Sequence, residues 1–115
     1  MFQEVKSMLP VSGDDYDQEI ILQIQACAID LTSSAEIVLP GEIRITRTQD
    51  AQTGAWTISD TSTLTDPFVM TVIGIWCNMH IGNPPNIDNL RSAYNSYKGQ
   101  MRTSRKYTAF GGAYE

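Results

Sequence analysis

The sequence predicts a mainly α-helical domain, a small bundle of about four helices with a β-hairpin inserted between the second and third. Four segments repeat apolar residues every three or four positions, as helices with one buried face do. Between the second and third segments the apolar residues alternate instead, as in strands. With 115 residues the chain can bury one modest core, so we expect a single domain over residues 1–115.

Two helices are expected before residue 35. The first is short and precedes Pro10. A turn at residues 12–15 leads into the second, with Asp14 or Asp15 as the expected N-cap. The second helix should end at about Ser34. The apolar residues of its expected buried face are Tyr16, Ile20, Ile21, Ile24, Cys27, Ala28 and Leu31.

The hairpin is expected at about residues 41–60. Ile43 and Ile45 alternate with polar residues before a polar, turn-rich segment, and Trp56 and Ile58 alternate after it. A lone two-stranded hairpin is only marginally stable in water. We therefore expect its support to come from the helices or from a neighbouring copy.

The third helix should begin at Pro67 with Asp66 as its cap. Its residues up to Ile81 are apolar nearly all round, so we expect it at the centre of the bundle. Gly74 in its middle indicates a close helix crossing, and Gly82 is the expected C-cap.

The fourth helix carries two parallel stripes and leads to a C-terminal tail at about residues 104–115. The apolar stripe is Leu90, Tyr94, Tyr97 and Met101. The basic stripe is Arg91, Asn95, Lys98, Arg102 and Arg105. The basic stripe is either a solvated face, a contact for an acidic partner surface, or a contact for DNA passing nearby. No DNA-reading motif surrounds it, so sequence-specific DNA recognition is not expected.

Charge is distributed unevenly along the chain. The net charge of −5 argues against a protein that coats nucleic acid, because neutralising phosphates requires an excess of Lys and Arg. Residues 1–40 hold seven acidic residues and one lysine, whereas residues 84–115 hold five basic residues and two acidic ones. These ends either bind copies of the chain head to tail, face two partners, or are two ordinary solvated faces. The candidate subunit-interface residues are Asp14, Asp15, Asp17, Arg91, Lys98, Arg102 and Arg105.

The sequence predicts no catalytic, metal-binding or cofactor-binding site. His80 is the single histidine, and Cys27 and Cys77 fall in apolar helical patterns typical of buried, reduced thiols. Residues 1–4 do not begin a signal peptide, and the apolar run at 68–81 is too short for a bilayer. We expect a soluble, intracellular protein that is not an enzyme and has no membrane contact.

Three motifs carry a resemblance to a known family. They are His80-Ile81-Gly82-Asn83-Pro84-Pro85, the helix Leu90…Tyr94…Tyr97-Lys98…Gln100-Met101, and the tail Thr108-Ala109-Phe110-Gly111. Together with the order of helices, they resemble the small head–tail connector proteins of tailed bacteriophages, also called DNA-packaging adaptors. The resemblance covers nearly the whole chain except the hairpin.

The resemblance implies a structural virion protein at the head–tail junction, assembled in the cytoplasm of a bacterial host. Such a subunit would form a ring under the portal protein, extend the DNA channel without reading the DNA sequence, and dock the next tail or stopper component. The implied portal-docking tail is Tyr107, Thr108, Ala109 and Phe110. The implied channel-facing hairpin residues are Arg44, Arg47, Gln49, Asp50 and Gln52. The alternative is a small helical regulatory or nucleic-acid-associated domain that uses the basic stripe.

Overall fold

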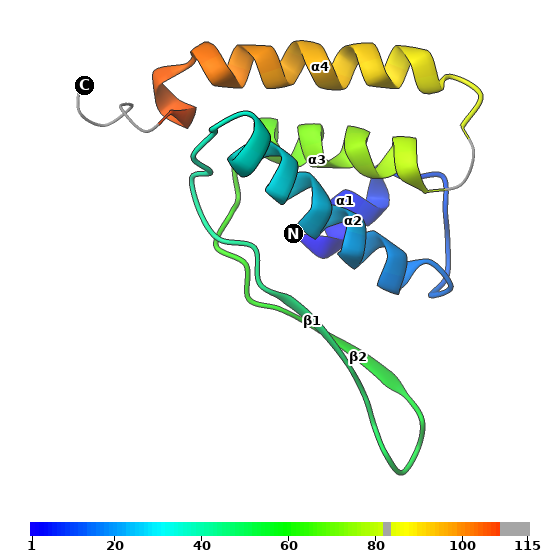
Figure 1. Ribbon diagram of the computed structural model, residues 1–115. Coiled ribbons are helices and arrows are strands. Elements are labelled where there is room, and N and C mark those ends of the chain that lie inside the picture. Colours follow the sequence, from blue (N-terminus) through cyan, green and yellow to red (C-terminus); the bar gives the residue numbers. More distant parts are fainter. Residues whose placement is uncertain (82–83, 109–115) are drawn as a thin grey trace.

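The computed structural model describes residues 1–81 and 84–108, and within them it confirms the predicted fold class. Four α-helices surround one core, and a β-hairpin lies between the second and third (Figure 1). A turn of π-helix at Asp30–Ser34 continues the second helix, and a 3-10 turn at Arg105–Tyr107 follows the fourth. The elements are α1 (Phe2–Ser7), α2 (Asp17–Ile29), β1 (Ile45–Gln49), β2 (Trp56–Asp60), α3 (Pro67–His80) and α4 (Ile87–Thr103).

Helix α3 is the centre of the bundle, as its apolar sequence predicts. It contacts α1, α2 and α4, and α4 runs back along it in the opposite direction (Figure 1). Val69, Val72 and Ile73 are completely buried. A Cβ at Gly74 would collide with the sulfur of Met8 at the end of α1, so the predicted close approach is confirmed at this glycine.

Helix α2 begins later than its cap pattern predicts. Its N-cap is Tyr16, and neither Asp14 nor Asp15 caps it with a side chain, so that prediction is wrong. The reason is that the turn closes through the backbone: the Asp17 amide donates to the Asp14 carbonyl at 3.2 Å. Tyr16 is also 43% exposed and does not belong to the buried face. The later apolar residues of that face, from Ile20 to Leu31, pack in the core.

For α3 and α4, the observed caps and apolar stripes agree with the sequence-based predictions better than they do for α2. Asp66 caps α3 as predicted, accepting hydrogen bonds from the amides of Phe68 and Val69 at 2.9 and 3.2 Å. On α4, Tyr94 and Met101 are buried, and the other two members of the apolar stripe pack partly buried against the core. The predicted C-cap at Gly82 lies outside the described residues.

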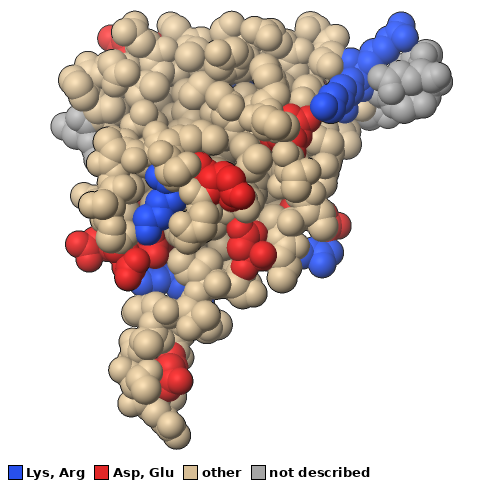
Figure 2. All heavy atoms as spheres, turned by 180° about the vertical axis from the view of Figure 1, so that it is seen from behind, with Lys and Arg blue, Asp and Glu red and all other residues tan. Residues whose placement is uncertain are grey.

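The hairpin extends away from the helical body (Figure 1). Its strands pair antiparallel, with Ile45 opposite Asp60 and Gln49 opposite Trp56. Ile45 is the only buried residue of the two strands. Seen from behind, the hairpin is a narrow protrusion that carries few charges, whereas charged residues gather on the helical body above it (Figure 2).

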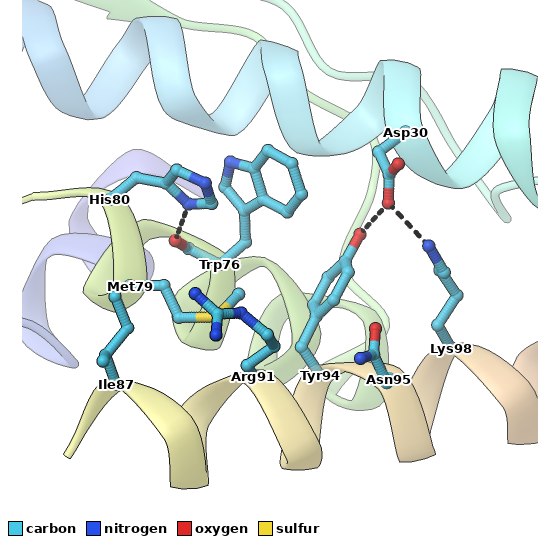
Figure 3. A pocket seen from close by; sticks show the side chains of 9 residues that line it. All are labelled: Asp30, Trp76, Met79, His80, Ile87, Arg91, Tyr94, Asn95 and Lys98. Carbon is cyan, nitrogen blue, oxygen red and sulfur yellow. Dashed lines mark hydrogen bonds and ion pairs between the residues drawn. The ribbon is translucent and has the colours of Figure 1, made fainter.

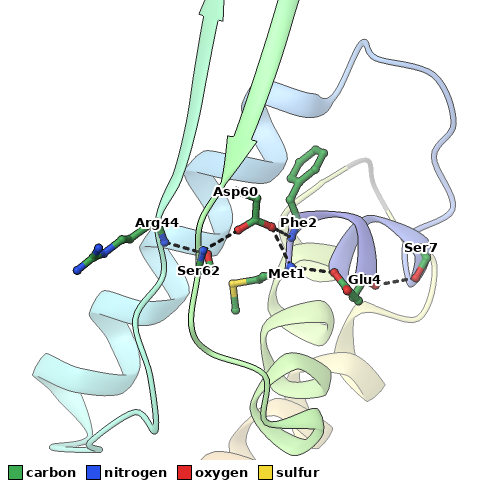
Figure 4. Close-up of polar contacts among 7 residues, drawn as sticks. All are labelled: Met1, Phe2, Glu4, Ser7, Arg44, Asp60 and Ser62. Atoms are coloured by element: carbon green, nitrogen blue, oxygen red, sulfur yellow. Dashed lines mark hydrogen bonds and ion pairs between the residues drawn. The ribbon is translucent and has the colours of Figure 1, made fainter.

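The base of the hairpin is anchored to the start of the chain through Asp60 (Figure 4). The Phe2 amide donates to Asp60 Oδ2 at 2.7 Å, and the amino nitrogen of Met1 lies 2.8 Å from the same oxygen. The Ser62 amide donates to Asp60 Oδ1 at 3.1 Å. Burial disfavours the charged carboxylate, but these donors outweigh burial and hold the pKa of Asp60 well below its ordinary value of 3.8.

Candidate functional site

A pocket of about 430 Å³ lies where α2, α3 and α4 meet (Figure 3). It brings together Arg91, Asn95 and Lys98 from the basic stripe of α4 and Asp30 from the end of α2. Part of the stripe that the sequence left open as a solvated face is therefore the wall of a pocket. The remaining lining residues are Trp76, Met79, His80, Ile87 and Tyr94.

One side of the pocket is closed by hydrogen bonds to Asp30. The Tyr94 hydroxyl donates to Asp30 Oδ2 at 2.5 Å, and Lys98 Nζ lies 3.0 Å from the same oxygen (Figure 3). Burial, and then the bond to the Asp30 carboxylate, raise the pKa of Tyr94 far above its usual range, so the hydroxyl stays protonated and remains a donor. These bonds tie α4 to the end of α2 and hold Lys98 in place.

The opposite side of the pocket is an aromatic wall. The rings of Trp76 and His80 stack with their centroids 4.3 Å apart, and Tyr94 lies tilted 5.2 Å from Trp76. Trp76 Nε1 donates to the side-chain oxygen of Gln23 on α2 at 3.0 Å. Ring contacts on two sides and a hydrogen bond on the third hold the indole in one orientation.

Of the two basic residues in this pocket, Arg91 has a weaker ion pair than Lys98. Its side chain is 60% exposed, and it pairs with Asp88 on the same helix, 3.4 Å away and 92% exposed. An exposed ion pair of this kind contributes about 0–1 kcal/mol, so Arg91 can exchange Asp88 for a better-placed anion at little cost. The pocket can therefore bind a carboxylate beside an apolar or aromatic group.

Two of the predicted subunit-interface residues make contacts within the chain. Asp17 is buried, with Lys6 Nζ 2.6 Å from its Oδ1, and the half-buried Lys98 is paired with Asp30. Burial leaves Asp17 little room for a partner from outside, and the interface itself stays a prediction. The remaining predicted interface residues have exposed side chains: Asp14, Asp15, Arg91, Arg102 and Arg105.

The predicted docking tail also begins inside the fold. Tyr107 is only 6% exposed; its hydroxyl donates to Asp66 Oδ2 at 2.8 Å, and its ring stacks on Phe68 at 6.0 Å. Lys106 Nζ lies 2.7 Å from the same Asp66 oxygen. The expectation that Tyr107 is free for a neighbour is therefore wrong, because this residue latches the end of α4 onto the start of α3. Thr108 is partly buried, and the tail residues Ala109 and Phe110 lie outside the described residues.

Burial by itself disfavours the charged form of the Asp66 carboxyl group and would raise its pKa. The hydrogen bonds from Lys106, Tyr107 and the first amides of α3 overcome that effect, and the pKa of Asp66 is lowered. Burial and the neighbouring carboxylate together raise the pKa of Tyr107. The carboxylate and the phenol thus remain in the protonation states that form the bond.

All five hairpin residues predicted to face a channel take part in contacts within the hairpin, Gln52 through its backbone amide. Arg44 pairs with Glu42, and the Arg47 guanidinium lies over the Trp56 ring, 3.9 Å from its centroid. The Gln49 side chain donates to the carbonyl of Gly54 at 3.1 Å. Asp50 accepts from two amides of the turn, which lower its pKa, and Gln52 is exposed. Whether this hairpin lines a channel stays a prediction.

The outer face of α2 is a surface that the sequence reading missed. Leu22 is 49% exposed and Ile29 is 63% exposed, and they lie seven residues apart, two turns along the same face. Most neighbours of these residues on the face are uncharged, namely Gln18, Gln25, Ala26, Thr32 and Ser33, and the exposed Glu19 lies at its edge. The sequence contains this surface as a second apolar repeat of α2, Leu22 and Ile29, on the side of the helix away from the predicted core stripe.

Among the described residues, none of the helices is long and apolar enough to cross a membrane. Comparison with known proteins gave no relative: no family model, curated protein or solved structure matches the chain.

Proposed function

We propose that the chain is a structural assembly subunit of the head–tail connector kind, which forms a ring under a portal, extends the DNA channel and links the filled head to the tail. The exposed apolar pair on the outer face of α2 is the observation that supports this proposal best. Exposed Leu22 and Ile29 on that face are typical of a surface that another protein covers.

The energetics of this face favour association. Burying one Leu or Ile side chain contributes about 1.5–3 kcal/mol. The centre of a protein interface is depleted in charged residues, and the part of this face between Leu22 and Ile29 has none. The hairpin supports the same conclusion, since a two-stranded sheet with one buried residue needs a further surface for stability.

The pairing of basic residues is consistent with DNA that passes without being held. Lys6, Lys98 and Lys106 each have a carboxylate within 3.0 Å. Phosphate binding would have to break these pairs before any counterion release could favour it. In the alternative of an isolated nucleic-acid-binding domain, this pairing occupies Lys98 of the basic stripe and leaves Arg91, Arg102 and Arg105 exposed, so binding of duplex DNA is the measurement that separates the two.

Electron microscopy and sedimentation of the protein, alone and mixed with portal rings, test the proposal. We expect closed rings, and we expect Leu22→Glu with Ile29→Glu to prevent them, because each change buries a charge in the contact. Val38→Glu is the matched control, since Val38 is also 49% exposed but lies after the helix. A chain that stays monomeric with portal present, or binds random duplex DNA as single copies, would overturn the proposal.

A further inference from the structure

We propose that the pocket between α2, α3 and α4 binds the acidic loop Asp14–Tyr16 of a second copy of the chain, with a carboxylate of that loop on Arg91. This inference rests on the proposed function and names the residues through which neighbouring subunits meet. Three observations carry it: the chemistry of the pocket, the exposure of the loop, and the positions of the two on opposite sides of α3.

The pocket has the chemistry of a site for a carboxylate next to a ring. Among the described residues, Arg91 is paired with the exposed Asp88, whereas the charge of Lys98 at the far side is matched by Asp30. Met79 and Ile87 supply apolar surface on the side of Arg91 away from Lys98 (Figure 3). A volume of about 430 Å³ is at the small end for a ligand site and suits one or two protein side chains.

The loop has the complementary chemistry. The Asp14 side chain is 93% exposed, and its nearest cation, Lys6, is 4.0 Å away and already bound to Asp17 at 2.6 Å. Asp15 is also exposed, and the ring of Tyr16 beside it is 43% exposed. Two carboxylates and an aromatic ring are thus presented together.

The loop cannot reach the pocket of its own chain. Tyr16 lines a different hollow, together with Asn78 of α3, whereas the pocket is lined by Trp76 and His80 of the same helix. At about 100° per residue, Asn78 points nearly opposite to Trp76, and His80 lies close to Trp76. The loop and the pocket therefore lie on opposite sides of α3, and a contact between them joins two copies.

This contact is of the kind that builds rings. The two surfaces are different, so each copy can bind one neighbour through its loop and another through its pocket. Head-to-tail contacts between unlike surfaces close into rings where the rotation permits and otherwise form filaments. The same geometry leaves the outer face of α2 and the hairpin available for the remaining contacts.

Charge reversal with rescue tests the inference. Arg91→Glu, and separately Asp14→Arg with Asp15→Arg, should each weaken assembly of the full chain by about tenfold or more, measured by sedimentation across a concentration series. The combination of all three changes should restore assembly to within about threefold, because the reversed charges attract again. Ser96→Glu is the matched control: it places a glutamate at an exposed residue of the same helix outside the pocket, and it should have little effect.

Thermal unfolding of each variant distinguishes the loss of a subunit contact from the loss of the fold. All altered side chains are exposed, so the melting temperature should not change.

A second test is independent of charge: Asp15→Cys with Asn95→Cys should form an intermolecular disulfide under mild oxidation, since Cys27 and Cys77 are buried. The inference is overturned if Arg91→Glu behaves like Ser96→Glu, if the combination fails to rescue, or if no cross-link forms. In each of these cases a wild-type ring leaves the proposed function standing, whereas a wild type that never assembles overturns both.

Discussion

The helical body and the hairpin of this chain are stabilised in different ways. The four helices share one continuous core, in which residues such as Ile24 and Ile73 are completely buried. The hairpin buries only Ile45 within its strands and leaves Trp56 half exposed. The body is therefore determined by contacts within the chain, whereas the hairpin has an ordered backbone whose side chains remain available to another molecule.

The polar contacts of the two regions differ in the same sense. In the body, ion pairs join separate elements: Lys6 to Asp17, and Lys98 to Asp30, 68 residues earlier in the chain. In the hairpin, beyond the Asp60 contact with Phe2 at its base, the contacts are local, such as the one between Asp50 and the amides of its own turn. Long-range pairs fix how helices pack, and local pairs fix only the shape of a turn. The comparison can be tested by matched changes in the two regions.

The largest effect is expected from one substitution made in each region. Ile73→Ala should lower the free energy of unfolding by about 3 kcal/mol, because Ile73 is fully buried in α3 and its loss leaves a cavity. Ile58→Ala in β2, where the side chain is only partly buried, should cost less than about 1 kcal/mol. Urea unfolding of both variants measures the difference. Equal losses would show that the hairpin belongs to the same cooperative core.

The contacts of Asp66 with Tyr107 and Lys106 should have the next largest effect on stability. Asp66→Ala removes the cap of α3 and the partner of Tyr107 and Lys106, and should cost about 2 kcal/mol in urea unfolding at pH 7. Tyr107→Phe removes one of these bonds only and should cost about 1 kcal/mol. A cost for Asp66→Ala no larger than that for Tyr107→Phe would show that the cap contributes nothing.

The same residue predicts a pH dependence. The pKa of Asp66 is lowered in the folded chain from its ordinary 3.8, so the charged carboxylate stabilises the fold at all pH values above about 4. That stabilisation is lost as the pH falls through the lower, folded pKa. Wild type and Asp66→Ala should therefore differ less in unfolding free energy at pH 2–3 than at pH 7. A difference that stayed constant with pH would contradict the assignment.

A smaller, local effect is expected where the two regions join. Asp60→Ala removes the acceptor of the Phe2 amide and should loosen the hairpin base by about 1 kcal/mol. Hydrogen exchange should become faster at the amides of β1 and β2, while the core amides of α3 keep their protection. Faster exchange throughout α3 would show that body and hairpin open together.

The smallest effect on stability is expected at Trp56. Its ring is 51% exposed and stacks on Arg47, and an exposed contact of this kind contributes about 0.5–1 kcal/mol. Trp56→Ala should therefore change the melting temperature little, and any larger change should appear in assembly measured by sedimentation. A large fall in melting temperature would mean that the indole stabilises the isolated chain.

Local patterns were sufficient for elements whose cause is local. The Asp66 cap before Pro67 and the apolar stripe from Leu90 to Met101 predicted helices that the structure confirms. Leu22 and Ile29 form a second apolar repeat on α2, but the exposed outer face was not predicted from it, because one face of this helix was already assigned to the core.

By itself, the sequence determined the fold class, the order of the elements and the central place of α3, since helical period, strand alternation and caps are properties of short segments. Only the tertiary structure decided which charges are available. It buried Asp17 against Lys6, paired Lys98 with Asp30, held Tyr107 on Asp66, and left Arg91 in an open pocket. The physical reason is that a partner distant in sequence becomes a neighbour only once the helices have packed, and no local pattern records that distance.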